Sequence, residues 1–340
     1  MTVDEAVALS LIPDLSRIGL GQRLRAGDPE LLYEASRLRA EARDVRCRAE
    51  AAGIGVLPWN DARFPAALLA IADPPPVLWH RGSLDALRAP AVAIVGSRAA
   101  SAAALETAAR IGRDLAAIGV TVVSGLARGV DSAAHRGALR AGRTMAVLGS
   151  GVDRIYPPEH RALAADISAG GLVISEYPPG TPPLAFHFPM RNRLISGVSL
   201  AVVVVEASER SGSLITAACA LEQGREVMAV PGNVLSGRNR GAHALLRDGA
   251  TIVEGVDDIV EELGRTVRRD EPASDTSNGS GSTSSADPLV RLMQPGQPYD
   301  LDGLAGLSGL DGARLLPRLL DLELHGLVRR IEGGRFLRSM

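Results

Sequence analysis

Loops rich in glycine, serine and arginine recur through the middle of the chain, each directly after a short apolar run. They are GSR at 96–98, SGLARGVDSAAHRGAL at 124–139, GSGVDRIYPPEHR at 149–161, EASERSGSLITAA at 206–218 and PGNVLSGRNRGAH at 231–243. Glycine allows a ligand to approach the backbone, and a helix that follows offers free N–H groups to an anion. Arginine binds phosphate through paired hydrogen bonds. These residue types therefore predict phosphate binding.

A segment rich in proline and aromatic residues, YPPGTPPLAFHFPMRNRLISGVS at 177–199, adds rings to these arginines. Four of the ten aromatic residues of the chain are Tyr156, Tyr177, Phe186 and Phe188. Bases stack on exposed rings while arginines hold the phosphates, so this combination favours single-stranded nucleic acid. Tyr156 lies in a polar loop and is expected to stack. For Phe186 and Phe188, a place in the core is an equally good interpretation.

The elements that position these loops follow from the hydrophobic pattern. Continuously apolar runs lie at 91–97, 120–125, 144–151, 171–176, 199–207, 226–232 and 250–255, with helices expected at 101–117, 130–141, 212–223 and 241–248. Strands without alternation are buried on both faces, which is typical of a parallel sheet covered by helices. The pattern predicts an α/β fold with an extended Rossmann-like, doubly wound, mostly parallel sheet. Ligands bind such sheets beyond the carboxyl ends of the strands, where the five loops meet.

Composition divides the chain into five segments. We expect a small helical domain at 1–55, a proline-rich connector packed on the core at 56–90 and the Rossmann-like domain at 91–263. A flexible linker at 264–286 and a winged-helix domain at 287–340 follow. Within the first segment, Asp28-Pro29 predicts a capped helix start. The segment 177–199 has no obvious strand, and Arg191, Asn192 and Arg193 are expected at the start of a helix.

Composition also excludes several kinds of site. All 37 basic residues are arginine, against 39 acidic residues, so a P-loop and a Schiff-base lysine are excluded. A net charge of −2 requires any DNA-binding arginines to be clustered locally. Two cysteines outside any CxxC motif predict neither a disulfide scaffold nor a cysteine-based zinc site. We expect no metal and no cofactor. An acidic N-terminus and the absence of a membrane-length apolar run predict a cytoplasmic protein.

Two enzymatic interpretations fit the loops less well. A dinucleotide site requires GxGxxG after the first strand, where this chain has GSRAAS, and the GSG at 149–151 lacks the third glycine. Nucleophilic hydrolysis would use Ser124, Ser211 or Ser213 with His135 or His187, but the chain has no GxSxG elbow. His135 is more simply a hydrogen-bonded structural residue. Among the glycines, we expect ligand approach at 96, 125 and 212 and tight turns at 170, 171, 224 and 249.

Seven motifs in fixed order resemble one known family. They are GSR at 96–98, SGLARGVDSAAHRGAL at 124–139, LGSGVDRIYPPEHR at 148–161, SEYPPGTPP at 175–183, FPMRNRLISGVS at 188–199, EASERSGSLITAACALEQGREVMAVPGN at 206–233 and GAHALLRDGA at 241–250. Together they resemble the DNA-processing protein A (DprA, also called Smf) family from about residue 56 to 263. The LELHGLVRR segment and the glycine wing that follows it resemble the winged helix of many members. The N-terminal segment resembles their SAM-like helical domain, with at most a degenerate hairpin, so we assign it no DNA contacts.

The resemblance implies a non-enzymatic protein that binds single-stranded DNA, protects incoming DNA and loads the RecA recombinase on it during natural transformation. It also implies a homodimer formed through the Rossmann-like domain. DNA contacts are implied at the GSR arginine and the loops around it. Some relatives place a lysine near position 158, where this chain has proline, so Arg154 or Arg161 is expected to substitute. The expected DNA-binding residues are Gly96, Ser97, Arg98, Ser124, Gly125, Arg128, Gly129, Arg154, Tyr156, Arg161, Arg191, Asn192, Arg193, Ser211, Gly212 and Ser213.

Two other functions remain as alternatives. A Rossmann-like nucleotide phosphoribohydrolase carries PGGxGTxxE, and the nearest segment here, 211–216, lacks the glutamate; Glu222 falls six residues after Thr216. A transcription regulator would read duplex DNA with the winged helix. However, the expected recognition helix at about 311–322 is largely apolar and offers few groups to base edges.

Overall fold

The computed structural model describes residues 1–12, 22–23, 26–270, 289, 292–294, 297–308, 315, 319, 322, 328–331 and 335–338. The chain divides into two compact units, Met1–Pro272 and Ala273–Met340. Within the described ranges, no helix combines the length and apolar character that crossing a membrane requires.

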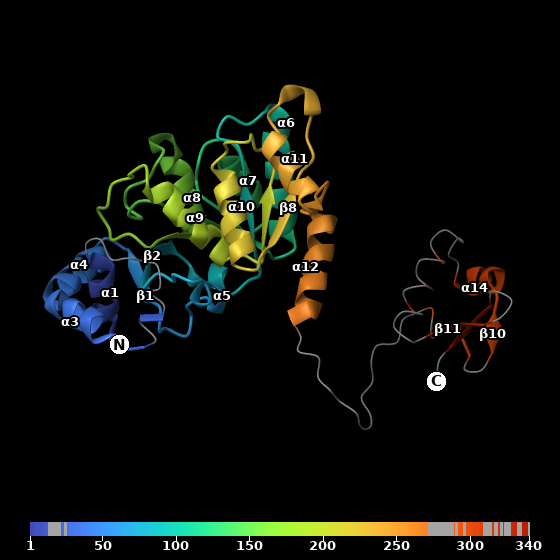
Figure 1. Ribbon diagram of the computed structural model, residues 1–340, viewed down its shortest axis with the longest axis horizontal. Helices are drawn as coiled ribbons and strands as arrows, with labels where there is room; N and C mark the ends of the chain where they lie inside the picture. The colour runs from blue at the N-terminus through green and yellow to red at the C-terminus, as the bar shows by residue number, and fades with distance from the viewer. Residues whose placement is uncertain are drawn as a thin grey trace, which may run out of the picture. The chain divides into compact units, whose positions relative to one another are not determined.

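The first unit is built on a nine-stranded sheet with strand order β1-β2-β6-β5-β4-β3-β7-β8-β9. Figure 1 shows β1 and β2 beside the N-terminal helices and β8 toward the other end of this unit. The strands are β1 Gly55–Pro58, β2 Val77–Gly82, β3 Ala91–Val95, β4 Thr121–Ser124, β5 Thr144–Val147, β6 Leu172–Ser175, β7 Ala201–Val204, β8 Glu226–Ala229 and β9 Thr251–Ile252. From β6 to β9 every pairing is parallel, whereas β2 pairs antiparallel with both β1 and β6. The doubly wound, mostly parallel sheet predicted from the apolar runs is confirmed.

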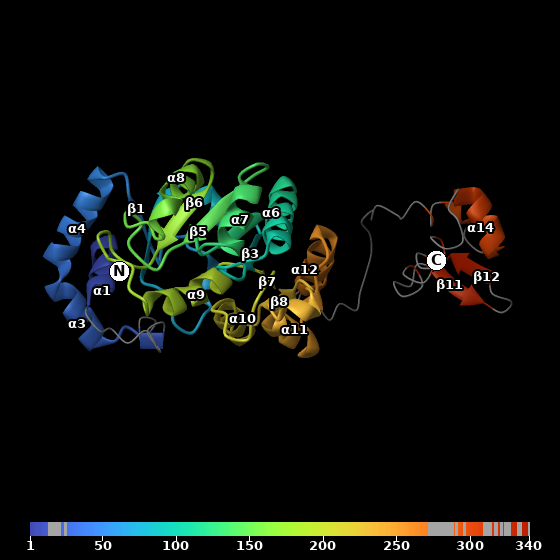
Figure 2. The ribbon, with the colours of Figure 1, turned by 90° about the horizontal axis from the view of Figure 1, so that it is seen from above.

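Helices cover both faces of this sheet because alternate side chains of each buried strand point to opposite faces. In β3, Ala93 and Val95 belong to one core cluster, while Val92 and Ile94 belong to another. Figure 2 shows α8, α7 and α6 along one face and α9, α10 and α11 along the other. The helices are α5 Ala66–Leu69, α6 Ala102–Ala117, α7 Val130–Ala138, α8 Arg161–Gly170, α9 His187–Gly197, α10 Ser213–Glu222, α11 Arg240–Arg247 and α12 Val256–Asp270. Short 3-10 turns lie at Leu84–Leu87, Pro158–His160 and Val234–Ser236.

Three details differ from the sequence-based expectation. The proline-rich connector does more than pack on the core, because it adds β1 and β2 to the sheet. Pro58 is tolerated because β1 is an edge strand. Arg191, Asn192 and Arg193 lie in the middle of α9, which already begins at His187. Helix α12 continues to Asp270, past the residue at which the linker was expected to begin, and the rest of that linker lies outside the described residues.

The N-terminal residues form the expected helices, α1 Val3–Leu11, α3 Pro29–Arg37 and α4 Arg39–Ala51. As predicted, Asp28 caps α3, accepting hydrogen bonds from the backbone N–H groups of Glu30 and Leu31. These helices share a core cluster with the sheet, including Trp79 of β2 and Leu126 beyond β4. They therefore pack on the sheet and belong to the same compact unit.

The second unit contains a three-stranded antiparallel sheet in the order β10-β12-β11. Its described elements are β10 Pro298–Tyr299, α14 Leu301–Ser308, β11 Val328–Ile331 and β12 Arg335–Arg338. Leu304, Leu315, Leu319, Val328 and Phe336 are buried in its core. The strands flanking the expected glycine wing are thus present, while Gly333-Gly334 and most of the expected recognition helix lie outside the described residues.

Candidate nucleic-acid interface

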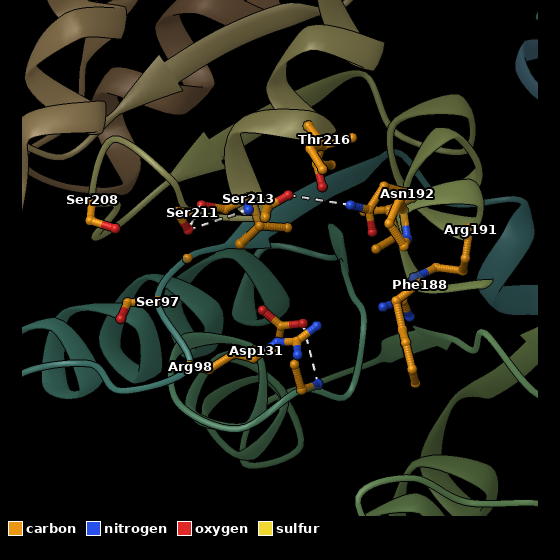
Figure 3. A pocket seen from close by; sticks show the side chains of 17 residues that line it. Ser97, Arg98, Asp131, Phe188, Arg191, Asn192, Ser208, Ser211, Ser213 and Thr216 are labelled. Atoms are coloured by element: carbon orange, nitrogen blue, oxygen red, sulfur yellow. Dashed lines mark hydrogen bonds between the residues drawn. The ribbon is translucent and has the colours of Figure 1, made fainter. Parts of the chain in front are cut away.

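A cleft of about 400 Å³ opens where the winding of the sheet reverses. Strands β3 and β7 are neighbours, but the chain leaves β3 toward α6 on one face and leaves β7 toward α10 on the other. The two loops diverge and leave a crevice beyond the carboxyl ends of the strands, which is where α/β sheets bind ligands. Residues 95–98 line one side of this cleft, and residues 211–216 with α9 line the other (Figure 3).

Arg98 and Phe188 form one wall of the cleft, and Tyr156 continues this wall into a small adjoining pocket. The guanidinium carbon of Arg98 lies 5.8 Å from the centre of the Phe188 ring. That ring lies 5.5 Å from the ring of Tyr156, at an interplanar angle of 43°. Arg98 and Tyr156 are exposed, and among the described residues Arg98 has no acidic partner. A cation and an exposed ring therefore stand side by side, the combination that binds the phosphate and the base of one nucleotide.

Hydroxyl and amide groups at the start of α10 form the opposite wall. Ser211 Oγ and Ser213 Oγ lie 2.7 Å apart and share a hydrogen bond. Asn192 of α9 donates from its side-chain amide to the carbonyl oxygen of Gly212 at 3.3 Å, which ties the two helices together (Figure 3). The positive end of the α10 dipole faces the cleft here. This wall is polar and, with Arg98 opposite, suited to an anion.

The positive end of the α6 dipole already has an acidic partner within the protein. Buried Glu206, just past β7, accepts hydrogen bonds from the N–H of Ser101, each carboxylate oxygen at 3.3 Å. In a dinucleotide-binding fold the pyrophosphate occupies the N-terminus of this first helix. A carboxylate at this position repels a phosphate, so the geometry supports the interpretation that the cleft is not a dinucleotide site.

Arg191 and Asp131 form the buried floor between the two walls. Arg191 is 4% exposed and donates from Nη1 to the carbonyl oxygens of Gly125, at 2.9 Å, and of Val147. Asp131 accepts hydrogen bonds from the N–H groups of Gly125 at 3.0 Å and Ala127 at 3.3 Å. Burial lowers the pKa of Arg191 to about 10, which keeps it charged near neutral pH. Burial raises the pKa of Asp131, and the nearby charge of Arg191 opposes that rise.

Two of the expected DNA-binding residues belong to the scaffold. Arg193 is buried and pairs with Asp73 at 2.8 Å and with Glu176 at 2.7 Å, so it joins the connector to the end of β6. Ser124 is completely buried, and its hydroxyl donates to the carbonyl oxygen of Ile94 at 2.6 Å. Neither side chain offers surface to a ligand in this structure.

Three more of the expected arginines are exposed. Arg128 lies beside Tyr156 in a small adjoining pocket and pairs with Glu159 at 2.5 Å. Arg154 lies 3.7 Å from Asp153. Arg161 is exposed at the first residue of α8, without an acidic partner among the described residues. Arg128 and Arg154 are solvent-exposed, so these pairs are weak and a phosphate can replace the carboxylate.

Packing within the protein explains two of the three glycines assigned to ligand approach. A Cβ at Gly96 would lie 2.6 Å from Val130 Cγ2, and a Cβ at Gly125 would lie 2.5 Å from Arg191 Nη2. At Gly212 no atom lies within 4 Å of such a Cβ, so space for a ligand exists there. Gly129 has φ +75, and a Cβ there would overlap the carbonyl oxygen of Ser97. Gly129 therefore allows the Arg98 loop to pack against the start of α7.

The histidines considered for catalysis are held in structural hydrogen bonds. His135 is buried, with Nδ1 2.7 Å from Thr144 Oγ1, as the structural interpretation predicted. His187 is buried, with Nδ1 3.2 Å from the carbonyl oxygen of Gly149, and its ring stacks on Tyr177. Over the described ranges, no serine of the cleft is hydrogen-bonded to the ring of His135. Across these ranges, no group of three or more His, Cys, Asp or Glu side chains is placed to hold a metal ion.

The buried His135 predicts a specific pH dependence of stability. Burial lowers its pKa to about 3, whereas an unfolded histidine titrates near 6.5. As the pH falls below about 6.5, His135 of the unfolded chain binds a proton, whereas the buried His135 of the native state stays neutral. The free energy of unfolding therefore falls. In His135→Gln this contribution is absent. Urea unfolding between pH 7 and 5 should therefore show a slope up to about 1.4 kcal/mol per pH unit shallower in the variant. Equal slopes would contradict a neutral, buried His135.

The exposure of the four aromatic side chains shows which of them lie in the core and which are accessible to a ligand. Phe186 is 64% exposed and Tyr156 is 40% exposed, whereas Tyr177 is buried. Phe188 is half-buried between Arg98 and Tyr156. Neither Asp131 nor Glu206 was among the binding residues expected from the sequence. A carboxylate that directly follows an apolar run, as Glu206 does, was the available signal for a buried acid at the sheet edge.

Comparison with known proteins decides the family. The family model described as DNA recombination-mediator protein A matches residues 55–264. The chain belongs to the DNA recombination-mediator protein A family. The model of the DprA winged helix domain matches residues 271–334, which supports a winged helix in the second unit. The family resemblance inferred from the seven motifs is thereby confirmed.

Relatives in the family share the central part of the chain. Protein Smf of Escherichia coli K12 is 47% identical over 210 residues, which are 61% of this chain and 56% of that protein. The putative DNA processing protein DprA of Mycobacterium tuberculosis H37Rv is 44% identical over 272 residues, 78% of this chain and 69% of that protein. The match thus covers little more than half of the E. coli protein.

Solved structures of the family have the same fold. DNA processing protein A from Streptococcus pneumoniae is similar with a TM-score of 0.69 and 36% identity, covering 77% of this chain and 98% of that one. DNA processing protein A from Helicobacter pylori is similar with a TM-score of 0.57 and 28% identity, covering 63% of this chain and 96% of that one.

Proposed function

We propose that this protein binds single-stranded DNA through the cleft at the β3/β7 switch point. The observation that carries the proposal is the wall in which Arg98 lies 5.8 Å from the Phe188 ring and Tyr156 lies beside that ring. A mononucleotide pocket needs one such unit, but a second exposed cation, Arg128, lines the adjoining pocket together with Arg98 and Tyr156. Two cations with a ring between them suit a strand of more than one nucleotide. DNA processing protein A from H. pylori, a structural relative, has a single-stranded DNA binding mode.

The residues proposed to contact DNA line the cleft or the cavities next to it, or are exposed arginines in the segment 154–161 that contains Tyr156. They are Gly96, Ser97, Arg98, Arg128, Gly129, Arg154, Tyr156, Arg161, Asn192, Ser211, Gly212 and Ser213, with Gly125 and Arg191 as the floor. Backbone N–H groups and hydroxyls hold phosphates without reading bases, and stacking on a ring tolerates every base. The proposed binding is therefore independent of sequence and sensitive to salt.

Arg98→Ala tests the proposal directly. We expect weaker binding to every single-stranded oligonucleotide, because one phosphate contact and one cation beside the rings are lost. The slope of log affinity against log salt should fall in magnitude by about 0.7, the value for one phosphate contact on a single strand. Fluorescence anisotropy across a salt series measures both quantities. Arg98→Lys keeps the charge and should retain part of the affinity.

The control for Arg98→Ala is stability. Arg98 is exposed and unpaired among the described residues, so the free energy of unfolding should change by less than about 0.5 kcal/mol. An unchanged affinity and an unchanged salt slope would show that Arg98 does not touch DNA. Release of free base from nucleoside monophosphates would instead favour the phosphoribohydrolase. Preference for duplex DNA would favour the regulator that reads it with the winged helix.

We further propose, on the family resemblance, that the protein acts in the cytoplasm without enzymatic turnover, protecting incoming DNA and loading RecA on it during natural transformation. The homodimer implied by the resemblance is likewise a proposal. Two observations on the first unit support it: β9 is an edge strand, and Ile252 of β9 and Val260 of α12 are 55% and 44% exposed. An edge strand with apolar side chains is a surface that proteins usually cover.

A further inference from the structure

A second, wholly basic groove begins where the cleft ends. It has a volume of about 390 Å³ and runs between α6 and α7, which lie side by side on one face of the sheet (Figure 2). Arg98 lines both the cleft and this groove. At the far end lie Arg136 of α7 and Arg140 just beyond it. The two cavities are therefore neighbours that share one arginine.

The charge of this groove is of one sign. Three arginines and no aspartate or glutamate line it, within a chain that carries 39 acidic residues. Arg136 and Arg140 are exposed, and over the described ranges no carboxylate pairs with either. Both line the groove, so their side chains lie on the same side of this helix end. Cations left unpaired in a groove create a local potential that attracts a polyanion.

The floor of the groove consists of small side chains. Ala109 of α6 and Ala133 and Gly137 of α7 line it, and a Cβ at Gly137 would overlap the carbonyl oxygen of Ala109. The helices are thus packed closely, and a strand backbone can lie on them between the arginines. Among the residues that line the groove there is no aromatic ring. The groove can hold phosphates but cannot stack bases.

We infer that single-stranded DNA bound in the cleft continues past Arg98 into the α6–α7 groove, where Arg136 and Arg140 hold its phosphates. This inference rests on the proposed function and extends it by giving the strand a path and a direction. The cleft, with its rings, anchors the strand, and the groove lengthens the site. Affinity should therefore depend on oligonucleotide length, and the arginines of the groove should matter only once a strand is long enough to reach them.

The test compares oligothymidylates of about 6 and about 20 nucleotides, which bracket typical site sizes. Anisotropy is measured for the full chain and for Arg136→Ala/Arg140→Ala. We expect the short strand to bind both proteins equally. The long strand should bind the variant roughly tenfold more weakly, with a salt slope lower in magnitude by about 1.4, the value for two phosphate contacts. Charge reversal, Arg136→Glu/Arg140→Glu, should enlarge the loss for the long strand alone.

A matched control removes two other exposed arginines, in Arg48→Ala/Arg247→Ala. Arg48 lies on α4 and Arg247 ends α11 on the opposite face of the sheet, and in the described part of the chain neither is paired with a carboxylate. This variant should bind both strands as the unmodified protein does. An equal loss for short and long strands, or no loss for the long one, would overturn the inference while leaving the cleft as the site. Failure of the unmodified protein to bind either strand would overturn the proposed function as well.

Discussion

Replacing Arg191 with methionine should lower the free energy of unfolding by about 3–5 kcal/mol, the usual cost of removing one partner from a buried charge pair. The variant leaves the carbonyl oxygens of Gly125 and Val147 without their donor, and it leaves Asp131 buried without its neighbouring positive charge. Methionine fills much of the space, so the loss reports charge and hydrogen bonds rather than a cavity. Urea unfolding at pH 7 measures it.

The same variant should bind single-stranded DNA more weakly than Arg98→Ala does. Arg191 lines both the cleft and the adjoining pocket with Tyr156, and it holds the loop that follows β4. Its loss removes a positive charge from the floor and also releases that loop. If Arg191→Met were as stable as the unmodified protein, the buried arginine would not be the support that its contacts indicate.

Asp131 allows the source of the Arg191 effect to be isolated. In Arg191→Met the pKa of Asp131 should rise further above its ordinary value, because burial is no longer opposed. The native carboxyl then binds its proton more tightly than the unfolded chain does, so lowering the pH from neutral should restore part of the lost stability. Arg191→Met/Asp131→Asn should recover a similar part at pH 7, since the amide still accepts from Gly125 and Ala127. A loss that is simply additive would show that the two side chains are not coupled.

Gly129→Ala is expected to cost roughly 2–5 kcal/mol of stability, from backbone strain together with overpacking. Gly129 has φ 75 and ψ −126 at the start of α7, a conformation that an L-residue rarely adopts. The added Cβ would also overlap the carbonyl oxygen of Ser97. Relief of that overlap moves the Arg98 loop, so DNA affinity should fall although no side chain proposed to contact DNA is removed. Thermal or urea unfolding and anisotropy measure the two losses.

Gly212→Ala is the matched control for this variant. Gly212 also lies in a loop of the cleft, but its φ of −62 and ψ of −18 suit any residue, and no atom lies within 4 Å of the added Cβ. Both substitutions remove the same freedom from the unfolded chain, so their difference reports the native state. Stability should change by less than about 0.5 kcal/mol in Gly212→Ala. Equal destabilisation by the two substitutions would refute the packing argument for Gly129.

Glycines and charged residues of the same loops have different surroundings in the folded protein, and we therefore expect them to have different roles. The missing Cβ of Gly125 leaves room for the Arg191 side chain, and that of Gly129 leaves room for the carbonyl oxygen of Ser97. At Gly212 the corresponding space is open. Arg98 is exposed at the cleft, and Arg191 is buried beneath it. The candidate site is therefore an exposed set of arginines and rings on a buried floor of hydrogen-bonded charged side chains. We expect such a floor to keep the proposed contacts in place without closing the cleft to a long strand.

The buried strands and the position of the loops that follow them could be predicted from the sequence, because both depend on local patterns of residues. Continuous apolar runs such as AVAIV at 91–95 identify strands buried on both faces, and the loops that follow them must lie at one edge of the sheet. Strands β1 and β2 were missed because prolines interrupt their pattern and because the connector is short. Their place in the sheet depends on pairing with β6, which is distant in sequence.

Tertiary structure alone decided which of the arginines are exposed and which are buried. Arg191 and Arg193 belong to one RNR motif, yet residues two apart on a helix point to different sides. One therefore reaches the ends of β4 and β5 and the cleft, while the other reaches Asp73 and Glu176. The sequence determined that the middle of this chain is an α/β domain whose strands are followed by loops rich in glycine, serine and arginine, because apolar runs and turn residues act locally. The fold decided which arginines are buried and paired and which are exposed, because burial and charge pairing depend on residues that only the folded chain brings together.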